Sequence, residues 1–155
     1  MIFDWVVSLR YHMIMFCVSR LGNDERKKLA NQCKTIDAKY STIWKSECTH
    51  LVVSEKDFTV TEKLALALIL CIPVVTLPFI EQLKKLLTGT NREGNITLPD
   101  PNDYVPSAEN IGWKDIGLKS SPDLKVDPRR KNLFKNHHFI TLNEKVVCNS
   151  SNTSY

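Results

Sequence analysis

The sequence predicts an α/β fold in which a parallel β-sheet is covered by helices on both faces. The main observation is the order of patterns in residues 44–83, where an apolar run, a Leu/Ala-rich segment, a second apolar run and an amphipathic segment follow one another. These patterns predict strand, helix, strand and helix. Two strands joined by a helix pair in parallel, and a parallel sheet needs cover on both faces. The composition agrees, because 43% hydrophobic and 25% charged residues are typical of a soluble folded domain.

Each element of this stretch has a local cause. Residues 49–53 form a short, mostly apolar run that is typical of a buried strand. Residues 61–70 begin polar and become rich in Leu and Ala, which favours a helix. Pro73 stops that helix, so we expect residues 73–77 to form a strand that begins at its proline. Residues 78–87 place apolar side chains on one face and charged ones on the other, which predicts an amphipathic helix.

A membrane span is the alternative interpretation of part of this stretch. Residues 64–80 contain no charge over 17 residues, at the short end of the roughly 17–25 that a bilayer requires. Pro73 and Pro78 interrupt the run, and two β-branched valines lie between them. A helix end followed by a buried strand is therefore preferred.

The residues before this stretch add a strand, a helix and a second strand. Residues 12–18 form a continuous apolar run that predicts a buried strand. Asn23 or Asp24 can cap a helix that runs to about Lys34. Residues 39–44 are expected to form a short edge strand. The complete predicted order is β, α, β, β, α, β, α.

The composition changes after this region. Residues 89–131 are rich in Pro, Gly, Asn, Asp and Ser and lack periodicity, so we expect a linker, parts of which can dock on a neighbour. Residues 132–143 resemble the opening strand of a further domain. Residues 144–155 are of low complexity and are expected to be disordered. Residues 1–10 resemble the last strand of a preceding domain. The apolar linker residues expected to dock are Tyr104, Ile111, Trp113 and Leu118.

Charge and cysteine content limit the function classes. The net charge of +4, from 21 basic and 17 acidic residues, is too small to indicate nucleic-acid binding by itself. Five cysteines without C-x-x-C spacing indicate buried free thiols in a reducing compartment. The apolar N-terminus lacks the basic region of a signal peptide, so a cytosolic or nuclear protein is expected.

Four segments resemble one protein family. They are Cys17-x-Ser19-x-Leu21, residues 44–52 with Trp44 and Cys48-Thr49-His50, Val60-Thr61-x-Lys63 continuing to Pro73-x-Val75, and Arg130-Lys131-x-x-Phe134-Lys135 with Phe139-Ile140-x-Leu142-Asn143. The first three resemble a BRCT domain, and the fourth resembles the start of a second BRCT repeat. The resemblance implies a four-stranded parallel sheet flanked by three helices over residues 11–88, followed by a mostly irregular tail.

Within the BRCT family, the chain is most similar to the first of two repeats in a DNA double-strand-break repair protein. In that protein an FHA domain precedes the BRCT pair. By this resemblance, residues 1–10 are the remnant of an FHA-like domain and residues 132–143 the first strand of a truncated second repeat. Two positions depart from the usual pattern: Asp37-Ala38 replaces a common Gly-Gly turn, and Phe79 replaces a common Trp. Both fit the fold, because Asp suits turns and Phe fills a core.

The resemblance also implies a function. The chain would be a non-catalytic, nuclear module that binds phosphoserine- or phosphothreonine-containing adaptor proteins at DNA breaks. It would join a nuclease–ATPase repair complex through regions outside this chain. No cofactor, no membrane and little direct nucleic-acid binding are expected.

A phosphate site in this family requires a hydroxyl and a backbone N–H after the first strand, and a cation at the start of the second helix. Ser19 and the backbone N–H of Arg20 match the first two requirements, and Thr61 and Lys63 match the helix positions. A phosphoserine offers nearly two negative charges and three acceptor oxygens, and a helix N-terminus favours such an anion. Without a complete second repeat, binding is expected to be weak. Spacing alone favours a simpler interpretation, in which Ser19 is an ordinary strand-end serine, Thr61 a helix cap and Lys63 a solvated charge. The family resemblance favours the phosphate site.

Other functions remain open at this point. The domain can pack against another protein without reading phosphate, serve as the accessory BRCT of a ligase or polymerase, or bind DNA ends. Alternation would place Cys48 and His50 on one face, but no third partner completes a nucleophile or metal site, so a structural role is preferred. His137 and His138 diverge on a strand. The sequence contains no phosphate-binding or dinucleotide-binding glycine motif and gives no basis for catalysis.

Overall fold

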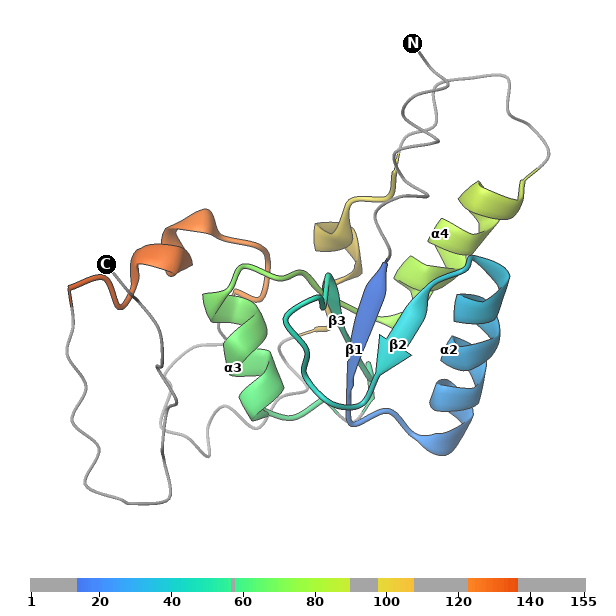
Figure 1. Ribbon diagram of the computed structural model, residues 1–155, viewed down its shortest axis with the longest axis horizontal. Coiled ribbons are helices and arrows are strands. Elements are labelled where there is room, and N and C mark those ends of the chain that lie inside the picture. The colour runs from blue at the N-terminus through green and yellow to red at the C-terminus, as the bar shows by residue number, and fades with distance from the viewer. Residues whose placement is uncertain (1–13, 57, 90–97, 108–122, 137–155) are drawn as a thin grey trace, which may run out of the picture.

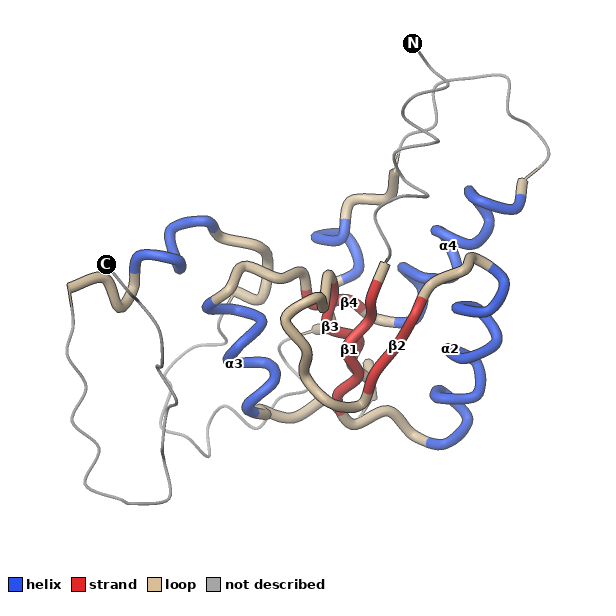
Figure 2. The backbone as a smooth tube through the Cα atoms, in the orientation of Figure 1, coloured by secondary structure: helices blue, strands red, loops and turns tan. Residues whose placement is uncertain are grey.

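The computed structural model describes residues 14–56, 58–89, 98–107 and 123–136 (Figure 1). One sheet has the strand order β2-β1-β3-β4, and each neighbouring pair is parallel (Figure 2). The predicted α/β fold with a four-stranded parallel sheet and three helices is confirmed. The strands are β1 (Met15–Ser19), β2 (Lys39–Ser41), β3 (His50–Val53) and β4 (Val74–Val75).

The helices cover both faces of the sheet. α2 (Asn23–Thr35) and α4 (Leu77–Thr88) lie side by side on one face, and α3 (Glu62–Ile69) covers the other (Figure 1). The crossover from β1 to β2 and the crossover from β3 to β4 run toward opposite edges of the sheet. Because such crossovers are right-handed, α2 and α3 must lie on opposite faces.

Side chains of the central strands alternate between two apolar clusters. Phe16 and Val18 of β1 face α2 and α4, whereas Cys17 faces α3. In β3, Val52 faces α2 and α4, whereas Leu51 faces α3. A strand that is buried on both faces needs apolar side chains at every position, which explains the continuous apolar runs of the sequence.

Two strands are shorter than predicted. β2 ends at Ser41 rather than at residue 44, because the Ser41 hydroxyl donates to the Ile43 carbonyl at 2.8 Å and accepts the Ile43 N–H at 3.1 Å, which turns the chain. β4 ends at Val75, because Thr76 caps α4 and Pro78 lies in the first turn of that helix. The run considered as a membrane span is therefore divided between α3, β4 and α4. No helix within the described residues is long and apolar enough to cross a membrane.

Parts of the predicted linker pack on the domain. Residues 98–107 include the 3₁₀ helix η1 (Pro101–Tyr104), and the Thr76 N–H donates to the Tyr104 carbonyl at 3.0 Å. From residues 123–136, Leu124 enters the cluster under α3 and is only 3% exposed. The packed unit thus continues beyond residue 88. Of the four residues expected to dock, Tyr104 packs against the core, and Ile111, Trp113 and Leu118 lie outside the described residues.

The strand predicted over 132–143 does not form in its described part. Residues 128–132 form the 3₁₀ helix η4 (Pro128–Asn132), and residues 133–136 form turns. The cause is local, because the Asp127 carboxylate caps the Arg129 N–H at 3.0 Å and the Arg130 guanidinium donates to the Lys125 carbonyl at 2.6 Å. The remaining part of that strand, 137–143, and the predicted end segments 1–10 and 144–155 lie outside the described residues.

Candidate phosphate-binding site

The fold brings two predicted site residues into contact at the carboxyl end of β1. Ser19 is the last residue of β1, and Thr61 is the N-cap of α3. Their hydroxyl oxygens are 3.0 Å apart, although 42 positions separate them in the chain. Two hydroxyls supply two O–H donors, and their mutual bond uses one of them. One O–H donor therefore remains for an acceptor outside the pair.

Thr61 has a structural role as well. Its hydroxyl oxygen accepts the N–H of Leu64 at 3.2 Å, which caps the first turn of α3. The uncapped N–H groups and the helix dipole give this terminus partial positive charge. Ser19 is only 6% exposed, so its hydroxyl lies in a partly desolvated position where a hydrogen bond is strengthened.

Lys63 places a cation at the carbonyl group that directly precedes Ser19. Its ammonium group donates to the carbonyl of Val18 at 2.9 Å and also contacts the carbonyl of Thr42. An ammonium has three N–H donors, and these two carbonyls use two of them. The lysine is therefore held in place and keeps one donor for an anion.

Arg20 follows Ser19 in an unusual backbone conformation. Its φ of 50° lies in the left-handed region, and its side chain is exposed. This conformation costs most residues about 1–2 kcal/mol, and glycine avoids that cost.

The Arg20→Gly variant is therefore expected to raise the free energy of unfolding by about 0.5–1 kcal/mol, after the larger chain entropy of glycine in the unfolded state is subtracted. Arg26→Gly is the matched control. Arg26 is an exposed residue within α2, where glycine is expected to lower stability by about 1 kcal/mol. Urea denaturation of both variants checks the prediction. A loss of stability in both would contradict the assigned strain at Arg20.

The N-terminus of α2 lies at the same edge of the sheet but is unsuited to a second anion. Its N-cap is Gly22, not the predicted Asn23 or Asp24, because the Glu25 carboxylate accepts the Gly22 N–H at 2.8 Å. The other carboxylate oxygen of Glu25 accepts the hydroxyl of Ser54 at 2.9 Å. The protein's own negative charge thus occupies this terminus. The α3 terminus, with a lysine beside it, has the opposite charge balance.

The Cys48 and His50 side chains do not share a face, contrary to the alternation expected from the sequence. Cys48 precedes β3 and packs in the cluster under α3, whereas the His50 ring lies 5.6 Å from Phe16 and 5.1 Å from Phe79 (centroid distances). Burial and the neighbouring Cys48 raise the pKa of the Cys17 thiol to about 11. The Cys17 thiol is therefore a poor nucleophile. Within the described residues, no three His, Cys, Asp or Glu side chains are grouped to hold a metal ion.

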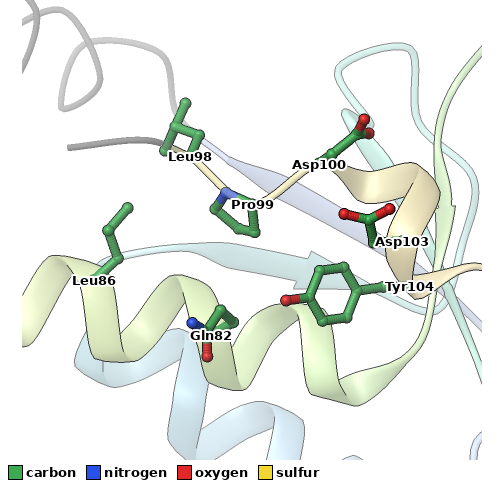
Figure 3. Close-up of a pocket in the computed structure, with 7 residues that line it drawn as sticks. All are labelled: Gln82, Leu86, Leu98, Pro99, Asp100, Asp103 and Tyr104. Atoms are coloured by element: carbon green, nitrogen blue, oxygen red, sulfur yellow. The ribbon is translucent and has the colours of Figure 1, made fainter. Parts of the chain in front are cut away.

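A separate groove of about 350 Å³ lies between α4 and residues 98–104 (Figure 3). Leu86 and Leu98 line its apolar part, and Asp100 and Asp103 lie at its polar side. The groove contains none of the four predicted site residues. The groove lies where residues 98–104, which the sequence predicted as part of a linker, pack against α4.

The sequence predicted the candidate side chains but not the backbone atoms that hold the lysine. The carbonyl groups of Val18 and Thr42 hold the Lys63 ammonium. Backbone carbonyls occur at every residue, so residue types carry no signal for them. The carbonyls of Val18 and Thr42 can both contact Lys63 only because the fold brings residues 42–43 close to the end of β1.

The domain type follows from the strand order and from comparison with known proteins. Residues 7–83 match the BRCA1 C Terminus (BRCT) domain. The chain carries a BRCT domain. Nibrin from Danio rerio is 27% identical over 146 residues, and nibrin from Gallus gallus is 27% identical over 144 residues. Nibrin from Mus musculus is 26% identical over 144 residues.

These matches cover 93–94% of this chain but only 16–18% of the nibrin sequences. The chain is therefore similar to nibrin over most of its own length and spans less than a fifth of each relative. The resemblance to a BRCT-containing protein that the sequence motifs indicated is therefore confirmed.

Proposed function

We propose that this chain is a non-catalytic phosphoprotein-binding and scaffold module of a nibrin-like DNA double-strand-break repair protein. The observation that supports it best is the hydroxyl pair of Ser19 and Thr61 at the N-terminus of α3, together with the Lys63 ammonium, which is bonded to the carbonyl directly before Ser19. This combination offers hydrogen-bond donors and positive charge, which a phosphate group requires.

Each group has a defined task in binding. The free hydroxyl donor of the pair binds one phosphate oxygen, the backbone N–H of Arg20 binds a second, and the unused N–H of Lys63 adds a charge-assisted bond. Each such bond contributes about 1.5–3 kcal/mol, and association itself costs at least several kcal/mol. The site alone therefore binds a phosphopeptide weakly, and partner selection requires further contacts.

The partners proposed for this module are adaptor proteins that carry phosphoserine or phosphothreonine at DNA breaks in the nucleus. The module would connect them to a nuclease–ATPase repair complex through other parts of the protein. The module is expected to bind proteins rather than membranes, with little direct binding to DNA. The similarity to nibrin supports this assignment.

Calorimetric titration with a phosphoserine peptide and its unphosphorylated twin tests the proposal. We expect phosphate-dependent binding that falls at least tenfold in Lys63→Met and in Ser19→Ala, because each change removes one hydrogen-bond donor to the phosphate. Lys27→Met is the matched control, since Lys27 is exposed on α2 and the charge change is the same. Equal binding of the two peptides to the unchanged protein would refute phosphate recognition.

A second candidate function is protein–protein packing without phosphate recognition. One observation favours it, since the bonds of Lys63 to two carbonyls already give this lysine a structural role. The two functions differ in one measurable respect. For a packing module, Lys63→Met would leave partner binding unchanged at equal protein stability.

A further inference from the structure

The loop after β2 presents an apolar side chain to solvent in a fixed position. Ile43 is 71% exposed, the largest exposed fraction among the large hydrophobic residues that the structure describes. Its backbone is held on both sides by Ser41, whose hydroxyl donates to the Ile43 carbonyl at 2.8 Å and accepts the Ile43 N–H at 3.1 Å. The exposure of Ile43 is therefore built into an ordered turn.

This turn adjoins the candidate phosphate site. The Lys63 ammonium contacts the carbonyl of Thr42, directly before Ile43, and donates to the carbonyl of Val18, directly before Ser19. The Lys63 ammonium thus contacts both the residue before Ile43 and the residue before Ser19. A ligand bound at Ser19 would therefore have the turn that carries Ile43 as a neighbour.

A second exposed apolar residue adjoins the site from the helix side. Val60 is 42% exposed and directly precedes Thr61, the partner of Ser19. Both polar members of the site therefore have apolar surface next to them. Single exposed apolar residues are common and need no explanation. These two differ because Ile43 follows the carbonyl that contacts Lys63 and Val60 precedes Thr61, so each adjoins a group of the candidate phosphate site.

We propose that Ile43 and Val60 bind a large aliphatic side chain one or two residues from the phosphorylated residue of the partner. The proposal rests on the proposed function and names its ligand class: phosphoserine segments flanked by Leu, Ile or Val. The phosphate bonds fix the register of the peptide. An extended peptide advances about 3.3 Å per residue, so a side chain one or two positions away lies within about 7 Å. Burial of its apolar surface adds the affinity that the phosphate bonds lack.

Three peptides test this inference by fluorescence anisotropy: a phosphoserine flanked by leucines, the same peptide with alanines, and the leucine peptide without phosphate. The unchanged protein is expected to bind the leucine phosphopeptide about tenfold more tightly than the alanine one, equal to about 1.4 kcal/mol. Ile43→Ser is expected to reduce that ratio below about threefold and to keep the affinity for the alanine phosphopeptide, because its phosphate contacts are intact.

Leu70→Ser is the matched control, because Leu70 is 49% exposed at the far end of α3 and its change is expected to preserve the tenfold ratio. Equal affinities for the two phosphopeptides, or an unchanged ratio in Ile43→Ser, would overturn the inference and leave the proposed function standing. Equal binding of the leucine peptide with and without phosphate would instead overturn the proposed function, and this inference with it.

Discussion

Replacement of Phe79 by alanine is expected to lower the free energy of unfolding by about 3–5 kcal/mol. Phe79 of α4 is only 4% exposed, and its ring centroid lies 5.1 Å from that of His50 and 5.6 Å from that of Tyr104. The ring thus joins β3, α4 and the segment 98–107. Loss of the ring leaves a cavity between three separate elements, and closely packed neighbours collapse into such a cavity only in part.

Urea denaturation measures this effect, with Leu70→Ala as the control. Leu70 is an apolar residue of similar size that is half exposed, so its truncation is expected to change stability by at most about 0.5 kcal/mol. A loss below about 1 kcal/mol in Phe79→Ala would mean that residues 98–107 do not depend on this ring.

Stability is also expected to fall as the pH is lowered from about 6.5 to 4. Burial between Phe16 and Phe79 lowers the pKa of His50 to about 4, whereas an unfolded histidine titrates near pH 6.5. In this window the unfolded chain binds a proton that the folded protein excludes. The contribution is fully present above pH 6.5 and is lost toward pH 4, at about 1.4 kcal/mol for each pH unit and about 3 kcal/mol in total.

The His50→Phe variant isolates this contribution from that of the carboxyl groups. Phenylalanine keeps an aromatic ring between its two neighbours and cannot titrate, so the stability of the variant is expected to vary less with pH. The measurement is urea denaturation of both proteins at several pH values between 4 and 7. Parallel stability curves would contradict the burial of a neutral imidazole at this position.

Local sequence pattern was sufficient for the elements and their order. Pro73 ended one helix and Pro78 began another, because a proline ring clashes in a helix interior but fits a first turn. The apolar runs in β1 and β3 predicted strands that are buried on both faces. Ser19, Thr61 and Lys63 were predicted as phosphate-binding residues from the family resemblance, before any contact between them was known.

Long-range contacts decided the rest. The sequence placed Cys48 and His50 on one face, and the structure separates them because regular alternation begins only where β3 begins. The sequence predicted residues 89–131 as a linker, yet Leu124 is buried. The sequence did not reveal this burial, because one apolar side chain in an irregular segment leaves no periodic signal.

By itself, the sequence determined that this chain folds as a parallel α/β domain, because periodicity and residue type are local properties that are sufficient for the elements and their order. The prediction that Ser19, Thr61 and Lys63 bind phosphate came from the family resemblance. Only the tertiary structure decided that Ser19 meets Thr61 at 3.0 Å and that the carbonyls of Val18 and Thr42 hold the Lys63 ammonium. Those distances depend on how β1, the loop after β2 and α3 pack together, and no single segment of the chain encodes that packing.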